Sequence, residues 1–156
     1  MWQKIIGRIV RIIKFDQTVY KEIEEDTGAN GEAAIVVVVA SILSAIGAGI
    51  YRRNFGAFAF DLIVGVLLFW LLVSYVTMLI GTRLYKGETN FWEMARCIGY
   101  ANAPRILGIF GAIPCIGWFA SLAAIILTLV VAFFAIREAL DLPTEKTLVS
   151  IALGWA

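Results

Sequence analysis

Two ionisable residues, Asp61 and Arg105, lie inside long apolar stretches of the sequence. A charge at the centre of a bilayer costs about 2.5–3.5 kcal/mol on insertion scales, so each side chain needs a partner or a route to the interface. On a helix, Asp61 lies about 5 Å inside the outer end of its stretch, within reach of headgroups, and Arg105 lies about 12 Å inside the inner end of its own, near mid-depth. One interpretation is therefore a contact between the two residues that gates a polar path.

The alternative for Arg105 involves Pro104, which removes a backbone donor and is expected to kink its helix near residues 100–103. Arg105 then extends to the inner surface or hydrogen-bonds carbonyls that the proline leaves unpaired. Two hydroxyl residues, Ser74 and Thr77, are further candidates for the lining of a polar groove. Hydroxyls inside helices commonly bond back to their own helix, however, so both interpretations stay open.

Four cations of the first fifteen residues, Lys4, Arg8, Arg11 and Lys14, recur at helical spacing. On a helical projection they occupy the arc opposite Trp2 and a series of isoleucines. A basic amphipathic helix of this kind lies flat in the membrane interface, where its cations face anionic headgroups. Docking of its apolar face against the rest of the protein is the alternative, and the two can coexist.

An acidic run, Glu22 to Asp26, follows this helix and precedes a turn rich in glycine and asparagine. Such a run is most often a solvated face rather than a cation site. Residues 1–32 are thus expected to form a cytoplasmic segment, amphipathic at first and acidic afterwards.

The residue types needed for catalysis are scarce. The chain has no histidine, and its two cysteines, Cys97 and Cys115, are too few and too far apart for a zinc site and are interpreted as buried small hydrophobic residues. No nucleophile–base pair or phosphate-binding glycine loop is visible, and a net charge of +1 offers no surface for nucleic acid. We expect no enzyme activity, no cofactor, no metal and no nucleic-acid partner.

Hydrophobic residues make up 61% of the 156 residues and charged residues 16%, against about 45–50% and about 25% in soluble domains. The excess is concentrated in four stretches long enough to cross a bilayer as helices, and in a fifth of about 15 Å, half a bilayer. The prediction is an all-α integral membrane helical bundle with the lipid bilayer as its first partner. Its transmembrane domain covers residues 33–156, with spans at 33–50, 58–82, 97–113 and 118–136 and a partial one at 147–156.

The distribution of lysine and arginine predicts the orientation, because cytoplasmic loops carry the excess of these residues. Ten lie in the segments on the N-terminal side of the membrane, and only Arg52 and Arg53 lie in segments on the other side. The N-terminus is therefore expected in the cytoplasm. Small residues recur every four positions along the first span, a spacing that suits either contacts inside the bundle or association with another copy.

Two motifs and one further segment carry a resemblance to a known family. Gly99, Tyr100 and Pro104 open the third span, Arg137 and Glu138 begin the loop before the last hydrophobic segment, and residues 20–26 precede the first span. Their order resembles the Yip-domain family, the Ypt/Rab-interacting membrane proteins, and most closely its short prokaryotic members. The resemblance implies a five-pass helical bundle with a cytoplasmic N-terminus, in the cell membrane of a prokaryote.

Eukaryotic members of that family act in vesicle trafficking and bind prenylated GTPases. The Asp-Leu-x-Gly-Pro element that they place before the first span is absent from this sequence, which argues against GTPase binding. The fifth span stops at Ala156, which suggests a shortened chain or a fragment. We therefore expect a non-enzymatic membrane organiser or adaptor that recruits protein or lipid partners, with a membrane protein or a second copy as candidates. The alternative is a permeation or transport component with a polar path around Arg105 and Pro104.

Overall fold

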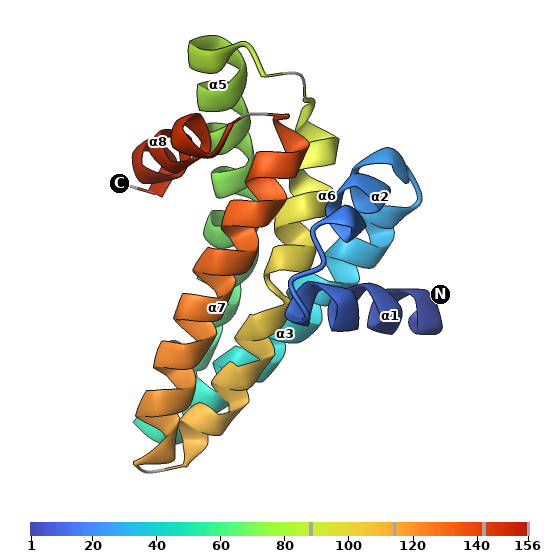
Figure 1. Cartoon of the computed structure of the whole chain (residues 1–156). Coiled ribbons are helices and arrows are strands. Elements are labelled where there is room, and N and C mark those ends of the chain that lie inside the picture. The colour runs from blue at the N-terminus through green and yellow to red at the C-terminus, as the bar shows by residue number, and fades with distance from the viewer. Residues whose placement is uncertain (88, 114, 142, 156) are drawn as a thin grey trace.

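The computed structural model describes residues 1–87, 89–113, 115–141 and 143–155, and every regular element in these ranges is a helix. The prediction of an all-α fold is confirmed. In chain order the elements are α1 (Trp2–Ile13), α2 (Thr18–Glu25), α3 (Ala29–Arg52), α4 (Phe55–Ile63), the π-helix η1 (Val64–Leu72), α5 (Val73–Tyr85), α6 (Phe91–Ala101), the 3₁₀ helix η2 (Ala103–Ala112), α7 (Ile116–Ala139) and α8 (Thr144–Trp155). The long helices run along the bundle, whereas α1 and α8 lie across it (Figure 1).

Among the described residues, three helices are long and apolar enough to cross a membrane: Ala29–Ile50, Phe58–Arg83 and Ile116–Ala139. They overlap the predicted spans 33–50, 58–82 and 118–136. The second is one unbroken helical path through α4, η1 and α5, and it ends at Lys86, which adopts the left-handed conformation. The turn between α3 and α4 is fixed by a left-handed Arg53 and by the Asn54 side chain, which accepts a hydrogen bond from Gly56 N.

The third predicted span, 97–113, consists of two helices rather than one. α6 ends at Ala101, and the tighter η2 begins at Ala103 with Pro104 in its first turn. The proline has no N–H to pair with the Tyr100 carbonyl. The Asn102 backbone N–H bonds Gly99 O, and the Asn102 side chain donates to Ile98 O at 2.8 Å. The kink expected at residues 100–103 is confirmed. With a rise of about 2.0 Å per residue, the ten residues of η2 extend about 20 Å.

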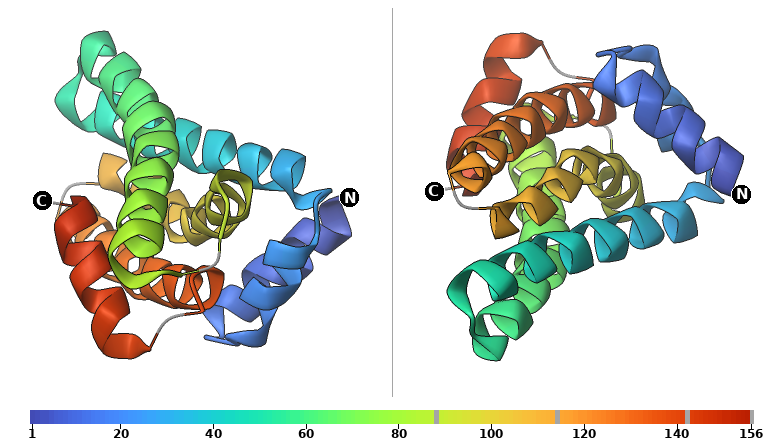
Figure 2. Two further views of the ribbon diagram at one scale, coloured as in Figure 1. Left: turned by 90° about the horizontal axis from the view of Figure 1, so that it is seen from above. Right: turned by 90° about the horizontal axis from the view of Figure 1, so that it is seen from below.

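The last hydrophobic segment, predicted as a partial span over 147–156, forms α8, a helix of about 18 Å. α8 packs on α5 and α7 and runs across them instead of parallel to them (Figure 2). Its direction differs from that of the three candidate spans, so it adds no further aligned segment to the bundle. Ala156, the last residue of that prediction, lies outside the described residues.

The centre of the molecule is α6, whose residues from Met94 to Ala101 are all buried. α6 packs against α2, α3, α5 and α7, and the views along the bundle show these helices around it (Figure 2). A capping box formed by Asn90 and Glu93 fixes its first turn. α6 therefore joins the N-terminal helices to the long apolar ones.

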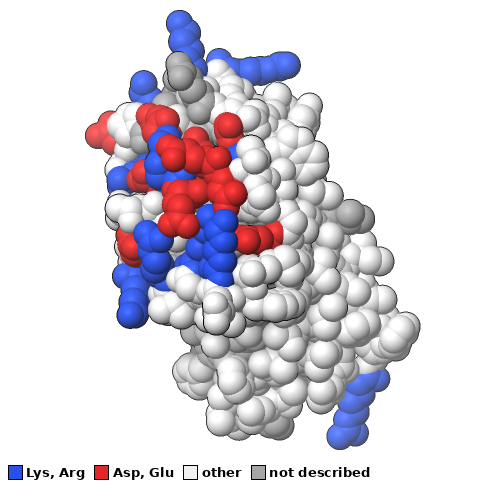
Figure 3. Space-filling view, turned by 90° about the vertical axis from the view of Figure 1, so that its right-hand side faces the viewer, with Lys and Arg blue, Asp and Glu red and all other residues white. Residues whose placement is uncertain are grey.

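Charged side chains gather at one end of the molecule, over α1 and α2, whereas most of the surface below them is uncharged (Figure 3). We call this end, which carries α1, α2 and α6, the polar end. The opposite end holds the turns between α3 and α4 and between η2 and α7, with Arg53 and Cys115 in them, and we call it the hairpin end (Figure 1). This distribution matches a bundle whose uncharged part lies in lipid.

Glycines bring α3 and η2 into backbone contact. A Cβ atom built on Gly47 would overlap the carbonyl group of Gly108, and one built on Gly108 would lie 3.1 Å from the Ser44 Cβ. Without a hydrophobic driving force in lipid, such close approach is a main source of helix association. The glycine at position 47 is thus required by packing and not by a turn.

Gly47→Ala is expected to destabilise the bundle by about 1–3 kcal/mol, since the added methyl group has no room. The matched control is Gly31→Ala, on the same helix, where nothing lies within 4 Å of the added Cβ. Alanine at position 31 should stabilise the protein by about 0.5–1 kcal/mol, because glycine inside a helix is less favourable than alanine. Unfolding in mixed detergent micelles measures both; equal stability of the two variants would contradict the assigned crossing.

Candidate functional site

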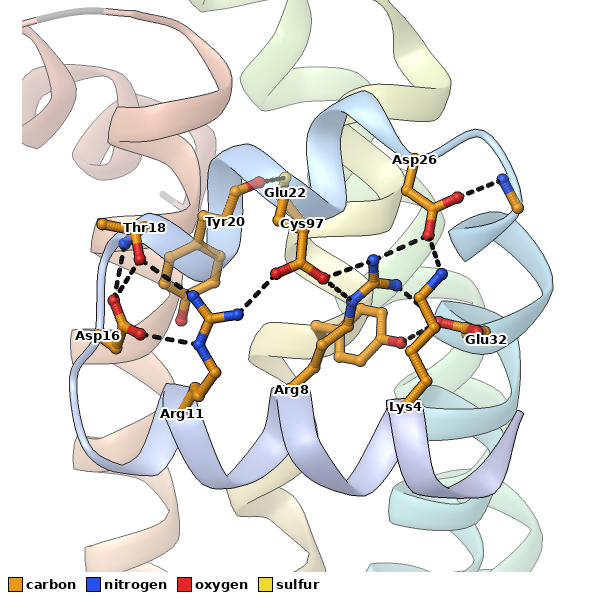
Figure 4. A network of polar contacts seen from close by, with 12 residues as sticks. Lys4, Arg8, Arg11, Asp16, Thr18, Tyr20, Glu22, Asp26, Glu32 and Cys97 are labelled. Carbon is orange, nitrogen blue, oxygen red and sulfur yellow. Dashed lines mark hydrogen bonds and ion pairs between the residues drawn. The ribbon is translucent and has the colours of Figure 1, made fainter.

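The guanidinium of Arg8 is the centre of a polar network at the polar end (Figure 4). It contacts three carboxylates, Glu32 at 2.7 Å, Asp26 at 2.8 Å and Glu22 at 3.0 Å. The Arg8 side chain is only 3% exposed. A buried guanidinium has five N–H groups to satisfy, and carboxylates around its fork supply the acceptors.

Tyr100 closes the network from the side of α6. Its hydroxyl donates to the Glu32 carboxylate at 2.6 Å, and the Arg8 Cζ lies 5.8 Å from the centroid of its ring. Glu32 therefore joins α1, α3 and α6 at one carboxylate. Arg8, Glu32 and Tyr100 come from segments far apart in the sequence, so this contact defines how α1 docks.

Two more cations of α1 flank Arg8. Lys4 contacts Asp26 at 2.5 Å, and Arg11 contacts Asp16 at 2.8 Å and Glu22 at 2.6 Å. Both side chains keep partial access to solvent, so each pair alone contributes little. Together with Arg8 they align one face of α1 with the acidic residues of α2 and the loop after it.

Charge pairing shifts the titration of these groups. The Lys4 ammonium, and after it Arg8, lowers the pKa of Asp26 to about 2. Arg11, ahead of Arg8, lowers the pKa of Glu22 despite partial burial. Burial acts to lower the pKa of Arg8, but its contacts with Tyr100 and Asp26 outweigh this and raise the pKa above its ordinary value. Arg8, Glu22 and Asp26 therefore stay ionised at neutral pH.

The structure corrects the prediction that Arg8 faces lipid headgroups, whereas for Lys4 and Arg11, which stay partly exposed, that contact remains a prediction. Arg8 is buried among its own protein's carboxylates, and the other two also pair with carboxylates of this chain. The acidic run was interpreted as a solvated face, but Glu22 and Asp26 bind these cations. Complementary charge is the physical reason: α1 and the acidic run are adjacent in the chain, so little chain entropy opposes their pairing.

Lys14, the fourth of these cations, differs from the other three. Its side chain is exposed, and it forms no ion pair with a carboxylate of the part of the chain that the structure describes. Its predicted contact with headgroups therefore stays a prediction.

The apolar face of α1 is divided between the protein and its surroundings. Ile5 and Ile12 are buried against the bundle. A neighbouring stripe of Trp2, Ile6 and Val10, continued by Ile13, stays exposed, with Trp2 and Ile6 each 58% accessible. The docked alternative thus holds for one side of the helix, and the stripe that stays uncovered leaves the interfacial alternative as a prediction.

α2 is bound to α6 by backbone contacts. The buried Arg96 guanidinium donates to the Glu24 carbonyl, and also to the Asn30 Oδ1 at 3.0 Å. The Cys97 Sγ lies 3.8 Å from the carbonyl of Tyr20. The charged layer is therefore held on the central helix by a second set of contacts, independent of Arg8.

The five motif residues lie mainly around this polar end. Gly99 allows α6 to approach α3, since a Cβ there would lie 2.8 Å from the Ala33 Cβ. Tyr100 caps the network, and Pro104 begins η2. Arg137 donates to Gln17 at 3.1 Å, which links the last turn of α7 to the loop before α2, and also contacts the neighbouring Glu138. In these contacts the motif residues bind the protein together.

A cavity of about 520 Å³ lies in the hairpin half of the bundle. Both intramembrane charges, Asp61 and Arg105, line it, together with the hydroxyl residues Ser44, Ser121 and Thr128. The remaining lining is glycine and apolar side chains. The two ionisable residues singled out from the sequence thus border one space, although they come from different helices.

Asp61 accepts a hydrogen bond from the Ser44 hydroxyl at 3.0 Å and is partly buried, so it points into the bundle, not out to headgroups. The Arg105 guanidinium lies 3.5 Å from the Gly65 carbonyl and 3.4 Å from the Asn102 Oδ1. Contact with a carbonyl agrees with the alternative proposed for Arg105, but the carbonyl belongs to η1 and not to the turn before Pro104. A Cβ at Gly65 would lie 2.9 Å from the guanidinium, so glycine there makes room for the arginine.

The other two polar candidates, Ser74 and Thr77, are fully buried and do not line the cavity. Ser74 donates to the Trp70 carbonyl of its own helix at 2.5 Å. The predicted polar groove therefore does not extend from Arg105 to these hydroxyls over the described residues.

The cysteines differ from each other in environment. Cys97 is buried as predicted, whereas Cys115 is exposed at the turn of the hairpin end, which corrects its interpretation as a buried residue. In the part of the chain that the structure describes, no group of three or more potential ligands could hold a metal ion.

One family model matches nearly the whole chain. The family model of the Yip1 domain matches residues 12–156. The chain belongs to the Yip1 domain family. The match covers the span-forming part of this Yip1 domain protein and the acidic run, and it starts within α1. Neither the curated proteins nor the solved structures gave a match.

Arg8→Gln is expected to destabilise the protein by about 3–5 kcal/mol, because it removes the cation and leaves a buried carboxylate at Glu32. The control is Lys14→Gln, which removes an exposed cation from the same segment and should change stability by no more than about 0.5 kcal/mol. Unfolding in detergent micelles gives both values. If the free energy of unfolding falls by the same amount in the two variants, Arg8 does not fix the position of α1.

Acid should weaken the attachment of α1 through Asp26. Its pKa is near 2 in the folded protein and about 3.9 in an unfolded chain. A lowered pKa contributes stability that is complete above about pH 4 and is lost as the pH falls toward about 2. The stability difference between wild type and Asp26→Asn should therefore shrink over this interval. Glu25→Gln, at an exposed neighbour, is the control; a difference that is constant with pH contradicts the assignment.

Proposed function

We propose that this Yip1 domain protein is a non-enzymatic membrane organiser that recruits a lipid surface or a protein partner at its polar end. It acts in the cell membrane of a prokaryote, with the polar end and the N-terminus in the cytoplasm. The observation that supports this most directly is the exposed stripe of Trp2, Ile6, Val10 and Ile13 on α1. The charged face of the same helix is already occupied by the protein's own carboxylates.

The position of α1 suits a contact in the plane of a membrane. α1 lies across the bundle axis and close to the boundary between the charged end and the uncharged part (Figures 1 and 3). A helix in that plane with Trp2 at one end can bury its stripe at the headgroup level. Because Arg8 fixes the rotation of the helix, the stripe keeps one direction relative to the spans.

The same network gives the polar end a defined surface for a protein partner. Arg8 and Arg11 hold Glu22 and Asp26 in place, and Arg96 holds the backbone of α2 on α6. Exposed residues such as Glu25 are then presented on a rigid support. Preformed surfaces of this kind lose less conformational entropy on binding.

Permeation is the second candidate, and the cavity at Arg105 is the observation in its favour. Its lining residues come from the hairpin half of α3, from α4, η2 and α7. Ser74 and Thr77, which a continuous path was expected to include, do not belong to the lining. A cavity that ends near mid-depth suits binding better than passage, so the organiser role is preferred.

The position of the stripe is tested with single cysteines carrying a spin label, introduced as Ile6→Cys and Lys4→Cys into a Cys97→Ala, Cys115→Ala background, because Cys115 is an exposed free thiol. Both proteins are reconstituted in proteoliposomes. The label at position 6 should be accessible to oxygen dissolved in lipid, and the label at position 4 to a water-soluble nickel reagent, because they lie on different faces of α1. Equal access of the nickel reagent to both positions would show that the stripe faces water.

Recruitment of a partner is tested by photocrosslinking in native membranes from Glu25 on α2, with Leu148 on α8 as the control position. A second protein crosslinked specifically from position 25 supports the adaptor role. If position 25 yields only the chain itself and lipid, as position 148 does, the recruitment of a protein is contradicted and the lipid surface remains.

A further inference from the structure

We propose that the cavity at the hairpin end binds the headgroup of a zwitterionic phospholipid that carries a phosphate and a primary ammonium, as in phosphatidylethanolamine. This site is distinct from the stripe on α1 and does not depend on the proposed organiser role. Its volume of about 520 Å³ falls in the range of about 300–1,000 Å³ typical of small-ligand sites.

Access from the bilayer is provided by α7. Trp118, Ile125 and Leu129 line the cavity and are also exposed on the outside of the bundle. These side chains lie in a candidate membrane span, so their exposed surfaces face acyl chains. A ligand that enters past them keeps its own acyl chains against an apolar surface while its polar part reaches the interior.

Opposite charges in one cavity select the ligand class. The Arg105 guanidinium presents N–H groups in the planar fork that matches phosphate oxygens. Asp61 accepts from Ser44 through Oδ2, which leaves lone pairs on its carboxylate for a further donor. A purely anionic headgroup would be attracted by Arg105 but repelled by Asp61, and a quaternary ammonium has no N–H to donate to Asp61.

A hydroxyl on α7 supports a polar occupant. The Thr128 Oγ1 is buried and has no hydrogen-bond partner among the described residues, although its side chain lines the cavity. Ser121 lies about two helical turns away on the same helix and lines the cavity too. Buried polar groups without partners are uncommon in native proteins, and a rotation of the Thr128 side chain toward the cavity would let its hydroxyl donate to a phosphate or ester oxygen of the ligand.

The depth of the cavity is also informative. Arg105 lies about 14 Å from the hairpin end along η2, at a rise of about 2.0 Å per residue. Water is scarce at that depth, so each charged contact with a ligand is strengthened, and a ligand without matching charges is excluded. The site therefore favours a compact headgroup with charges of both signs.

The test measures bound lipid by native mass spectrometry of the full chain in mild detergent. Phosphatidylethanolamine, phosphatidylcholine and phosphatidylglycerol with identical acyl chains are each added. Wild type should retain phosphatidylethanolamine about tenfold better than the other two, because only its ammonium adds a charge-assisted hydrogen bond to Asp61; tenfold corresponds to about 1.4 kcal/mol. Equal retention of all three lipids would overturn the proposal.

Variants separate the two charges. Arg105→Gln should lose about tenfold in retention of all three lipids, because each carries a phosphate. Asp61→Asn should retain phosphatidylethanolamine no better than phosphatidylcholine. Arg83→Gln and Glu145→Gln, at exposed positions outside the cavity, are the matched controls and should behave as wild type.

Thr128→Leu keeps the test decisive if the charge variants misfold. It fills the cavity with a larger side chain and leaves Asp61 and Arg105 unchanged. It should abolish the preference for phosphatidylethanolamine while circular dichroism and gel filtration stay as in wild type. If folded Thr128→Leu and Arg105→Gln both retain this lipid as wild type does, the lipid binds at the outer surface of the bundle, and the assigned site is wrong.

Discussion

The burial of one guanidinium constrains the polar end of this protein. Arg8 cannot be removed from water without acceptors around its fork, and three segments of the chain provide them through Glu22, Asp26 and Glu32. Because Glu32 also binds Tyr100, the direction of α1 is coupled to the position of the central helix. The exposed apolar stripe, the rigid surface of α2 and the place of α1 across the bundle all follow from that one arrangement.

The bundle below this network relies on a different kind of contact. In lipid the hydrophobic effect does not drive helices together, so close backbone contact stabilises the hairpin half, at Gly47 and Gly108. Gly65 has no side chain and so leaves space for the Arg105 guanidinium. Glycine-rich crossings leave space where larger side chains would fill it, and the cavity occupies that space. The two halves of the molecule thus combine a tightly paired charged layer with a more open apolar layer that encloses two charges.

Much of the architecture could be predicted from the sequence. Apolar length indicated the helices around 33–50, 58–82 and 118–136, and Pro104 indicated the break after α6, because hydropathy and the missing N–H act locally. The partners of Arg8 could not be found this way, since periodicity shows which face is charged but not whether lipid or protein meets it. The signal in the sequence that pointed to these partners was the acidic run Glu22 to Asp26, which lies next to α1 and carries the opposite charge. Asp61 and Arg105 line one cavity only because of how their helices pack. The spacing of residues along the chain does not show which helices pack together, so the cavity could not be predicted.

The partners of Arg8 have a consequence for the order in which the protein is assembled. All three carboxylates lie within the first 32 residues, so the ribosome supplies them before most of the first span has been synthesised. Tyr100 and Arg96 arrive only after the second apolar helix is complete. α1 and α2 can therefore form their ion pairs early, at the membrane surface. α6 is synthesised later and docks onto these two helices when they are already in place. Synthesis in this order thus pairs the charges of α1 and α2 while the apolar segments that follow are still entering lipid.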